Sequence, residues 1–531
     1  MQSGRRGKRG KEPFERAFAA VQTALAAGKL ENALGQLQAM EQKAFFPSER
    51  NWELHELMGQ ILFCLSDLEA ALPHLKMAWE LPRSDRTMRL AAMSNYLMDL
   101  HYVDGVSNEE LRAAHLAYAT LLGIPQPFTH TKRRREKLRI GYLSPNLTDH
   151  IVLNFAIQLF AAYDRDRFEV YLYDIGDLQS EVTDWVAGMA DRYVDLSKFT
   201  PTEAARRIHA DEVDILFDLA GHSAGGKTLQ IAAYKPAPVQ ISGIGYFNTT
   251  GLSAMDYFLG DAIADPPEMD ALFTERILRL PETHLCFTPS ERFRAYEQLQ
   301  RAPHTPVVFG SFNNFTKLND RVLQTWAEIL RRVPGSRLLF KTDVFSYPDA
   351  REEALVRIAA AGIPMDRVEA EGASRDYLAA YHRMDIALDP FPYPGGGTTC
   401  DALYMGVPVV TLAGDSLGSR FGASLLENIG AGALIAHTEE EYVERAVSLA
   451  GDSALLDALH AGLRGMMEKS PVMDAAGYGR DVGAAYEAVW KRYAERSAAL
   501  KSPAAYDDSM SMDLASLKDC IFAALAAERY A

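Results

Sequence analysis

Cysteine is scarce in this chain, which has four cysteines among 531 residues. They stand far apart, at positions 64, 286, 400 and 520, so no pair has the spacing of a metal-binding motif. A chain of this size with so few cysteines is typical of a reducing compartment, and we expect a cytoplasmic protein.

Long hydrophobic runs are also lacking. The most apolar stretch, residues 151–162, is shorter than the roughly 18 residues that span a bilayer, and it contains Asn154 and Gln158. We therefore expect no membrane span. The basic cluster near the N-terminus comprises Arg5, Arg6, Lys8, Arg9 and Lys11. No apolar segment follows it, so residues 1–12 are expected to form a disordered, solvated tail rather than a signal peptide.

Positive charge is in deficit, because the formal net charge is −16 at pH 7. Binding to duplex nucleic acid needs a basic surface that neutralises phosphates, so we expect no nucleic-acid partner. With 48% hydrophobic and 24% charged residues the composition is that of an ordinary globular protein. At roughly 150 residues per domain, the length predicts three or four domains.

Residues 13–130 predict an all-helical arm. Residues 14–42 and 52–81 lack strand-like alternation and are rich in Ala, Leu, Glu and Gln. The string GKLENA at 28–33 recurs as SDLEAA at 66–71, an offset of 38 residues. This is close to the period of about 34 residues of tetratricopeptide repeats. We expect the small residue of each string to make a turn and its alanine to let two helices approach. Pro82 should end the second unit.

After the basic run at 131–137 the pattern changes to alternating strands and helices. Strand-like runs are expected at 138–143, 168–173, 213–219 and 239–244, and again at 307–312, 337–340, 386–389 and 407–412. Such alternation predicts doubly wound parallel sheets. We expect two Rossmann-like domains facing a cleft, at 131–303 and 304–474, followed by a C-terminal helix and tail at 475–531. Ligands of such sheets bind at the carboxyl ends of the strands.

The sharpest motif is DPFPYPGGGTTCD at 389–401, between a predicted strand and a helix expected to start at Asp401. Three consecutive glycines, Gly395, Gly396 and Gly397, expose backbone N–H groups. Thr398 and Thr399 add hydroxyl donors, and such an assembly binds phosphate. Asp401 is placed to accept hydrogen bonds from a ribose. The alternative interpretation is a plain glycine-rich turn capped by Thr399.

Lys317 follows the first strand of the second sheet, so it should converge with the glycine-rich motif at the strand ends. A lysine and a helix N-terminus together can neutralise the charge of a departing diphosphate. The early Asp-x-Asp, Asp164 and Asp166, is interpreted as a solvated turn rather than a metal site. We therefore expect a site without metal or cofactor.

The first sheet offers side chains for the acceptor half of a transfer reaction. His150 stands at a helix N-terminus, where a histidine tends to stay neutral, and it can accept a hydroxyl proton or orient the acceptor. The alternative is a histidine that only caps the helix or is buried and hydrogen-bonded. Asp211 is a further candidate, or else a turn residue. Possible acceptor-side or sugar-side contacts are His222, Tyr246, Asn248 and Thr249.

These residues resemble the O-linked N-acetylglucosamine transferase and SPINDLY family of protein glycosyltransferases over residues 90–497. The resemblance is carried by RIGY at 139–142 leading to His150, DILFDLAGH at 214–222, KPAPVQ at 235–240, GYFNTTG at 245–251, MDY at 255–257, FNN at 312–314, DALYMGVPVVT at 401–411 and SRFGAS at 419–424. It implies a GT-B fold of two facing Rossmann-like domains behind a tetratricopeptide arm. It further implies metal-independent, inverting transfer from a nucleotide sugar such as UDP-GlcNAc to Ser or Thr hydroxyls of a protein held by the arm.

By position, the resemblance assigns roles to individual residues. His150 matches the family's active-site histidine, Asp211 a debated catalytic aspartate, and Lys317 the lysine that neutralises the diphosphate. Thr398 and Thr399 match the phosphate-binding threonines and Asp401 the ribose-binding aspartate. Asn314 falls where the N-acetylglucosamine enzymes have glutamine, and Ser374 and Tyr377 fall where the nucleotide base sits.

The chain also departs from the N-acetylglucosamine branch. Gly397 stands where those enzymes have a histidine, and Ser374 and Tyr377 replace their usual Lys and His. The loop at 393–397 is more similar to the SPINDLY branch, whose plant members transfer fucose from GDP-fucose. The donor is therefore open between UDP- and GDP-sugars. Two further alternatives are transfer to a small molecule, lipid or asparagine side chain, and a non-catalytic repeat scaffold.

Overall fold

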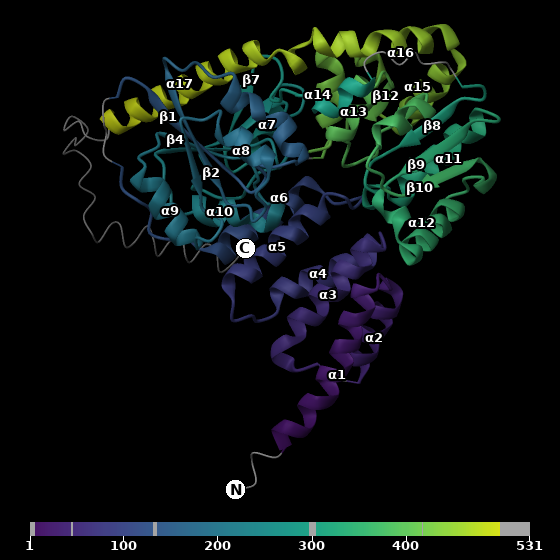
Figure 1. Cartoon of the computed structure of the whole chain (residues 1–531), viewed down its shortest axis with the longest axis horizontal. Helices are drawn as coiled ribbons and strands as arrows, with labels where there is room; N and C mark the ends of the chain where they lie inside the picture. The colour runs from purple at the N-terminus through teal and green to yellow at the C-terminus, as the bar shows by residue number, and fades with distance from the viewer. Residues whose placement is uncertain (1–5, 44–45, 131–134, 297–303, 417, 500–531) are drawn as a thin grey trace, which may run out of the picture. The chain divides into compact units, whose positions relative to one another are not determined.

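The computed structural model describes residues 6–43, 46–130, 135–296, 304–416 and 418–499 (Figure 1). The expectations for Arg5, for the basic run at 131–134, for the domain seam at 301–303 and for the tail from residue 500 lie outside the described residues. The chain forms two compact units, Met1–Tyr486 and Glu487–Ala531. The helical arm and both sheets belong to the first unit.

The arm consists of helices α1 (Arg6–Ala26), α2 (Leu30–Gln42), α3 (Asn51–Cys64), α4 (Leu68–Glu80), α5 (Arg86–Leu100) and α6 (Asn108–Leu122). The predicted repeat is confirmed, because Gly28 and Ser66 take matching left-handed turns, with φ of 68° and 65°. Ala33 and Ala71, five residues further on in each case, are both fully buried between helices. One expectation is wrong: α1 begins at Arg6, so residues 6–12 are helical. Arginine and lysine are good helix formers, and a run of charge does not exclude a helix.

The first Rossmann-like domain has a seven-stranded parallel sheet in the order β3-β2-β1-β4-β5-β6-β7. Its strands are β1 (Leu138–Ser144), β2 (Phe168–Asp174), β3 (Arg192–Asp195), β4 (Ile215–Asp218), β5 (Val239–Ser242), β6 (Tyr257–Asp261) and β7 (Arg276–Leu280). Helices α7 (Ile151–Ala161), α8 (Glu181–Ala187), α9 (Pro201–Ala210) and α10 (Lys227–Ala232) connect them. Leu143 of β1 lies opposite Tyr173 of β2 and Asp218 of β4, so the carboxyl ends of these strands share one edge.

The second domain repeats this plan with six parallel strands in the order β10-β9-β8-β11-β12-β13. Its strands are β8 (Val308–Ser311), β9 (Arg337–Lys341), β10 (Val368–Glu371), β11 (Ile386–Leu388), β12 (Val409–Leu412) and β13 (Ile435–Ala436). Its helices are α11 (Asp320–Arg332), α12 (Pro348–Ala360), α13 (Gly397–Tyr404), α14 (Phe421–Asn428), α15 (Glu439–Gly451) and α16 (Ser453–Glu468). The eight expected strands are all present. The sequence missed five others, among them β10, whose Val-Glu-Ala-Glu is half-exposed and too polar to be recognised.

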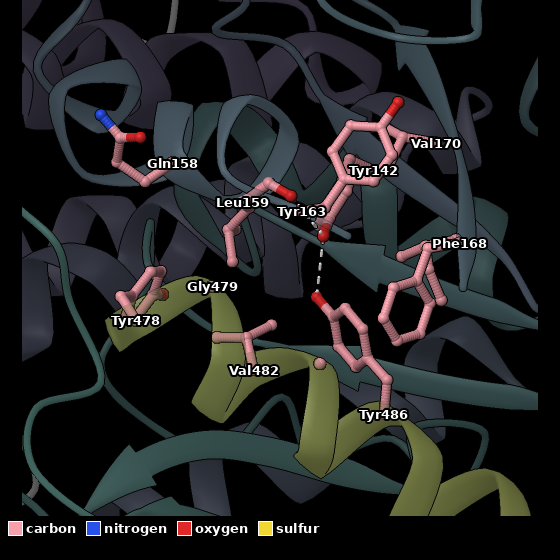
Figure 2. Close-up of a pocket in the computed structure, with 12 residues that line it drawn as sticks. Tyr142, Gln158, Leu159, Tyr163, Phe168, Val170, Tyr478, Gly479, Val482 and Tyr486 are labelled. Carbon is pink, nitrogen blue, oxygen red and sulfur yellow. Dashed lines mark hydrogen bonds between the residues drawn. The ribbon is translucent and has the colours of Figure 1, made fainter. Parts of the chain in front are cut away.

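The last helix, α17 (Ala475–Ala499), returns the chain to the first domain. The Tyr486 hydroxyl lies 3.0 Å from that of Tyr142 on β1, and Tyr142 also donates to the carbonyl of Leu159 on α7 (Figure 2). Gly479 packs so closely that a Cβ there would lie 2.2 Å from the carbonyl oxygen of Ala162. The predicted boundary at 475 is therefore not a structural one, since α17 up to Tyr486 completes the first domain.

None of the helices in the described residues is both long and apolar enough to cross a bilayer. Nor do three or more His, Cys, Asp or Glu side chains gather in that part of the chain as they would around a metal ion.

Candidate active site

A cavity of about 460 Å³ lies where the carboxyl ends of β1, β4 and β5 meet the glycine-rich loop of the second domain. The first domain contributes Asn146, His150, Ser223 and Phe247 to its wall, and the second contributes Lys317, Tyr393 and Gly396. The arm adds Met98 and Tyr102. The site therefore forms at the strand ends predicted for this type of sheet, from all three parts of the first unit.

Lys317 lies in the cavity wall, in a short turn after β8. Its ammonium group donates to the carbonyl oxygen of Pro394 at 3.0 Å and lies 4.8 Å from the ring centre of Tyr393. Burial lowers the pKa of Lys317 to about 8, against the opposing effect of the Asp389 carboxylate. The predicted convergence of this lysine with the glycine-rich loop is confirmed.

The glycine-rich loop leads into α13 four residues earlier than predicted, at Gly397 instead of Asp401. The first N–H groups of a helix have no partner within the helix. Gly396 and Gly397 line the cavity, so this positive helix end lies beside the ammonium of Lys317. Both place positive potential at the cavity wall.

Asp389 holds the loop in place, a role that the sequence analysis did not assign. Its fully buried carboxylate accepts from the Gly395 N–H at 2.7 Å and from the Thr411 hydroxyl at 2.8 Å. Its carbonyl oxygen accepts from the hydroxyl of Tyr442 at 2.9 Å. Burial raises the pKa of Asp389 to about 6, while its donors and Lys317 oppose the rise. The sequence feature that could have predicted this role is the position of Asp389 directly after a buried strand, β11.

Thr398 and Thr399, predicted to bind phosphate, are not among the described residues that line the 460 Å³ cavity. Thr398 donates its hydroxyl proton to Asn313 Oδ1 at 2.9 Å, and a Cβ on Gly395 would lie within 2.6 Å of both threonine hydroxyl oxygens. Both hydroxyls therefore face the loop. Asn314, predicted to bind the donor, is exposed and caps the turn after β8 by accepting from the Thr316 N–H. Its neighbour Asn313 is the one that reaches the loop.

The predicted nucleotide-binding residues form a separate group. The Tyr377 hydroxyl donates to Asp401 Oδ2 at 2.8 Å, whereas Ser374 is exposed nearby in the chain. Burial raises the pKa of Asp401 to about 7, despite the opposing hydrogen bond from Tyr377. None of these three is among the described residues that line the 460 Å³ cavity.

His150 lies in the cavity wall as the N-cap residue of α7. Its Nδ1 accepts from the Val152 N–H at 3.2 Å. Desolvation lowers the pKa of His150, opposed by Asp149, so the ring is neutral near pH 7, as expected. A neutral ring that accepts at Nδ1 carries its proton on Nε2. His150 therefore presents a hydrogen-bond donor, which favours the orienting role over proton abstraction.

The structure does not bring Asp211 to the cavity. Asp211 ends α9, before the amino end of β4, and is buried in an ion-pair cluster with Arg192 and Arg207, each 3.0 Å away. Its carboxylate also accepts from the Tyr173 hydroxyl. Asp211 follows α9 at the edge of the sheet opposite the strand ends that form the cavity, which agrees with the alternative interpretation as a turn residue before β4.

The four predicted acceptor-side contacts are wrong as direct contacts, because His222, Tyr246, Asn248 and Thr249 are all buried. Thr249 donates to the buried carboxylate of Glu275 at 2.6 Å, and the others contact the arm. Tertiary packing turned these polar side chains inward. The same loop instead presents Gly245 and Phe247 to the cavity.

Gly397 packs against Ile151, the residue after His150. A Cβ on Gly397 would lie 2.4 Å from Ile151 Cδ1, and both residues line the cavity. We expect Gly397→Ala to push Ile151 into the cavity and to weaken donor binding by about tenfold, with little loss of stability since Ile151 is 42% exposed.

The matched test is the double variant Ile151→Ala with Gly397→Ala, which removes the clash and should restore most of the affinity. Calorimetric titration with nucleoside diphosphates measures both variants. If Gly397→Ala and the double variant weaken donor binding equally, the contact with Ile151 is not the cause of the loss.

The comparisons with known proteins agree with this architecture. The family model for "Glycosyl transferase family 41" matches residues 115–298 and 288–482. A rice (Oryza sativa subsp. japonica) protein, "Probable UDP-N-acetylglucosamine--peptide N-acetylglucosaminyltransferase SPINDLY", is 38% identical over 77% of this chain and 45% of its own length. The SEC protein of Arabidopsis thaliana, named for the same probable activity, is 29% identical over 71% of this chain and 40% of its own length. The chain spans less than half the length of these curated relatives.

A solved structure of a mutant O-GlcNAc transferase from Thermobaculum terrenum has a TM-score of 0.80 and 31% identity, covering 89% of each chain. The structure has two Rossmann-like domains behind a repeat arm, and both domains line one cavity with a lysine and a helix N-terminus in its wall. This is the architecture of a glycosyltransferase of GT-B type. This chain belongs to glycosyl transferase family 41. The predicted fold, enzyme class and family are confirmed.

Proposed function

We propose that the chain transfers a sugar from a nucleotide sugar to Ser or Thr hydroxyls of a protein, with inversion at the anomeric carbon and without a metal ion. The observation that carries this proposal is Lys317, held in the cavity wall beside the N-terminus of α13. Their combined positive potential suits a departing diphosphate. The names of the rice and Arabidopsis relatives support a protein acceptor, which the arm is proposed to hold.

In this mechanism the acceptor oxygen forms a bond to the anomeric carbon while the bond from that carbon to the diphosphate oxygen breaks. Lys317 and the N–H groups at the start of α13 stabilise the charge that develops on the leaving diphosphate. His150 donates through Nε2–H and orients the reacting groups. The hydroxyl proton leaves to solvent, because no side chain of the described cavity wall is a carboxylate or an imidazole with an accepting nitrogen turned to the cavity.

The second candidate is the same reaction with a GDP-sugar such as GDP-fucose. Gly397 favours it, because this position contacts Ile151 and has no room for the histidine of the N-acetylglucosamine branch. The names of the rice and Arabidopsis relatives both specify UDP-N-acetylglucosamine, so they favour the first candidate.

The deciding experiment is a screen of UDP- and GDP-sugars with the full chain, in EDTA, against a library of Ser- and Thr-containing peptides. Intact mass and fragmentation identify the transferred sugar and the modified residue. Transfer in EDTA supports the proposal and identifies the donor. Binding of no nucleoside diphosphate, or transfer that requires an added metal, contradicts it.

The pKa of Lys317 gives a pH prediction. A lysine with a pKa near 8 carries its charge below that pH and loses it above. The affinity of the protein for UDP or GDP should therefore fall as pH rises above about 8 and level off near the affinity of Lys317→Ala. Titration calorimetry measures this profile, and Lys317→Ala should make it flat. An affinity that stays constant to pH 9.5 in the unchanged protein contradicts a role for the ammonium charge.

A further inference from the structure

Two loops at the cavity have strained backbones. Ala224, after β4, has φ of 50°, and Ile244, after β5, has φ of 71°. Both residues line the cavity. A β-branched residue rarely adopts this region, and each such residue costs about 1–3 kcal/mol. The N–H of Gly245 donates to the carbonyl of Gly243 at 2.9 Å and closes a tight turn around Ile244. Such conformations persist only where neighbouring structure enforces them.

The neighbouring structure is the arm, which reaches these loops through three buried histidines. His222, on the loop after β4, places Nδ1 3.1 Å from the Ser94 hydroxyl of α5 and Nε2 3.0 Å from the carbonyl oxygen of Thr250. It therefore joins both loops to α5. Gly226 lies directly against this helix, since a Cβ there would stand 2.3 Å from Ser94 Oγ.

The other two histidines come from the arm and hold the loop after β5. His115 of α6 places Nε2 2.6 Å from the Tyr246 hydroxyl. His101, directly after α5, places Nε2 2.7 Å from Asn248 Nδ2. The Nδ1 atoms of His115 and His101 lie 2.6 and 2.7 Å from the carbonyl oxygens of Leu111 and Leu97.

These contacts fix the proton on each ring. A ring nitrogen facing a carbonyl must donate, so His101 and His115 carry the proton on Nδ1 and His222 carries it on Nε2. The remaining nitrogen of each ring then accepts, from an amide or a hydroxyl. Every ring nitrogen has a partner of the correct polarity. Burial keeps all three rings neutral, because it lowers the pKa of His101 to about 4 and of His222 to about 3, with His115 also well below its usual value.

The same cluster reaches the opposite wall of the cavity. Tyr102 packs edge-on against Tyr393, with ring centres 5.0 Å apart, and His101 packs against Tyr393 at 6.2 Å. Tyr393 is the ring beneath the Lys317 ammonium. The turn directly after α5 thus contacts both the loop after β5 and the glycine-rich loop, while α6 contacts the loop after β5.

We infer that the last two arm helices are a working part of the catalytic site: His101, His115 and His222 are positioning residues that hold the loops after β4 and β5 in the conformation that receives the acceptor hydroxyl. The inference rests on the proposed function for its kinetic consequence. None of the three touches the cavity, and all act through Tyr246, Asn248 and the loop backbone. Substitutions that break these contacts should weaken acceptor binding and slow turnover, and should leave donor binding unchanged.

The test compares Tyr246→Phe with Tyr142→Phe. Each removes one buried, hydrogen-bonded tyrosine hydroxyl, but Tyr142 lies at the α17 contact of Figure 2, away from the cavity. Hydrogen exchange measured by mass spectrometry should rise about tenfold over residues 219–226 and 243–251 in Tyr246→Phe only. This readout needs no activity. Equal exchange of the two loops in both variants overturns the inference.

Kinetics separate positioning from a loss of folded protein. With the peptide that the unchanged protein modifies best, Tyr246→Phe should raise the acceptor KM about tenfold and leave the Kd for nucleoside diphosphate within about twofold. A structural effect alone would lower kcat and leave KM unchanged, which contradicts the inference. His115→Gln, whose Oε1 can accept from Tyr246, should recover most of what His115→Ala loses. If exchange rises in the loops while the unchanged protein transfers no sugar, the inferred positioning stands and the proposed function fails.

Discussion

Lys317→Ala should lower kcat for sugar transfer by about 10²–10³-fold, the cost of removing one donor to a developing anion. It should also weaken binding of UDP or GDP by about tenfold or more, since a charge-assisted hydrogen bond contributes about 1.5–3 kcal/mol. The effect is large because Lys317 is the only lysine or arginine among the described residues of the cavity wall.

The fold should survive this change. Asp389 keeps its hydrogen bonds from Gly395 and Thr411, so its buried carboxylate is not left without donors. Lys469→Ala is the matched control, because Lys469 is an exposed lysine at the end of α16 in the same domain and should change neither rate nor affinity. Lys317→Ala with turnover within a few-fold of the unchanged protein would remove the central element of the proposed mechanism.

His150→Ala should lower kcat by about 10²-fold while the Kd of the donor changes little. The Nε2–H of His150 is a donor fixed by the bond that Nδ1 accepts from Val152, so the ring acts through orientation and not as a base. A preorganised hydrogen bond of this kind contributes mainly in the transition state.

A second substitution decides between the two roles of His150. A glutamine side chain can donate an N–H at about the reach of Nε2 but cannot take up a proton near neutral pH. His150→Gln should therefore recover about tenfold of the lost rate. If His150→Gln is as slow as His150→Ala and added imidazole restores both, His150 is the general base and the inferred tautomer is wrong. The rate in the unchanged protein should show no rise with pH near the ordinary pKa of histidine, since burial lowers the pKa of His150.

The sequence predicted those parts of the site that depend on position along a strand. Lys317, His150 and Gly396 all follow strands of parallel sheets, and strand ends of one sheet converge wherever the alternating pattern holds. The two parallel sheets and eight of their strands followed from the same pattern.

Side-chain direction was the part that the sequence could not supply. His222 and Tyr246 also follow strands, but the arm covers them, and no local pattern reveals which loop a distant helix will bury. Asp211 looked like a site residue in sequence, although α9 places it at the opposite sheet edge. Asp389 belongs to the glycine-rich motif, but its structural role depends on a hydrogen bond from the backbone N–H of Gly395, which the sequence does not reveal.

The path of α17 has a mechanical consequence. The polypeptide passes from the first sheet to the second between β7 and β8 and comes back at the start of α17, so two covalent crossings tie the lobes together. Bodies tethered at two points can rotate about the line that joins the tethers, but they resist rotation about other axes. Opening to exchange nucleotide is therefore expected to be a one-dimensional, hinge-like motion, and cutting the chain just after α16 should add a torsional freedom that the intact enzyme lacks.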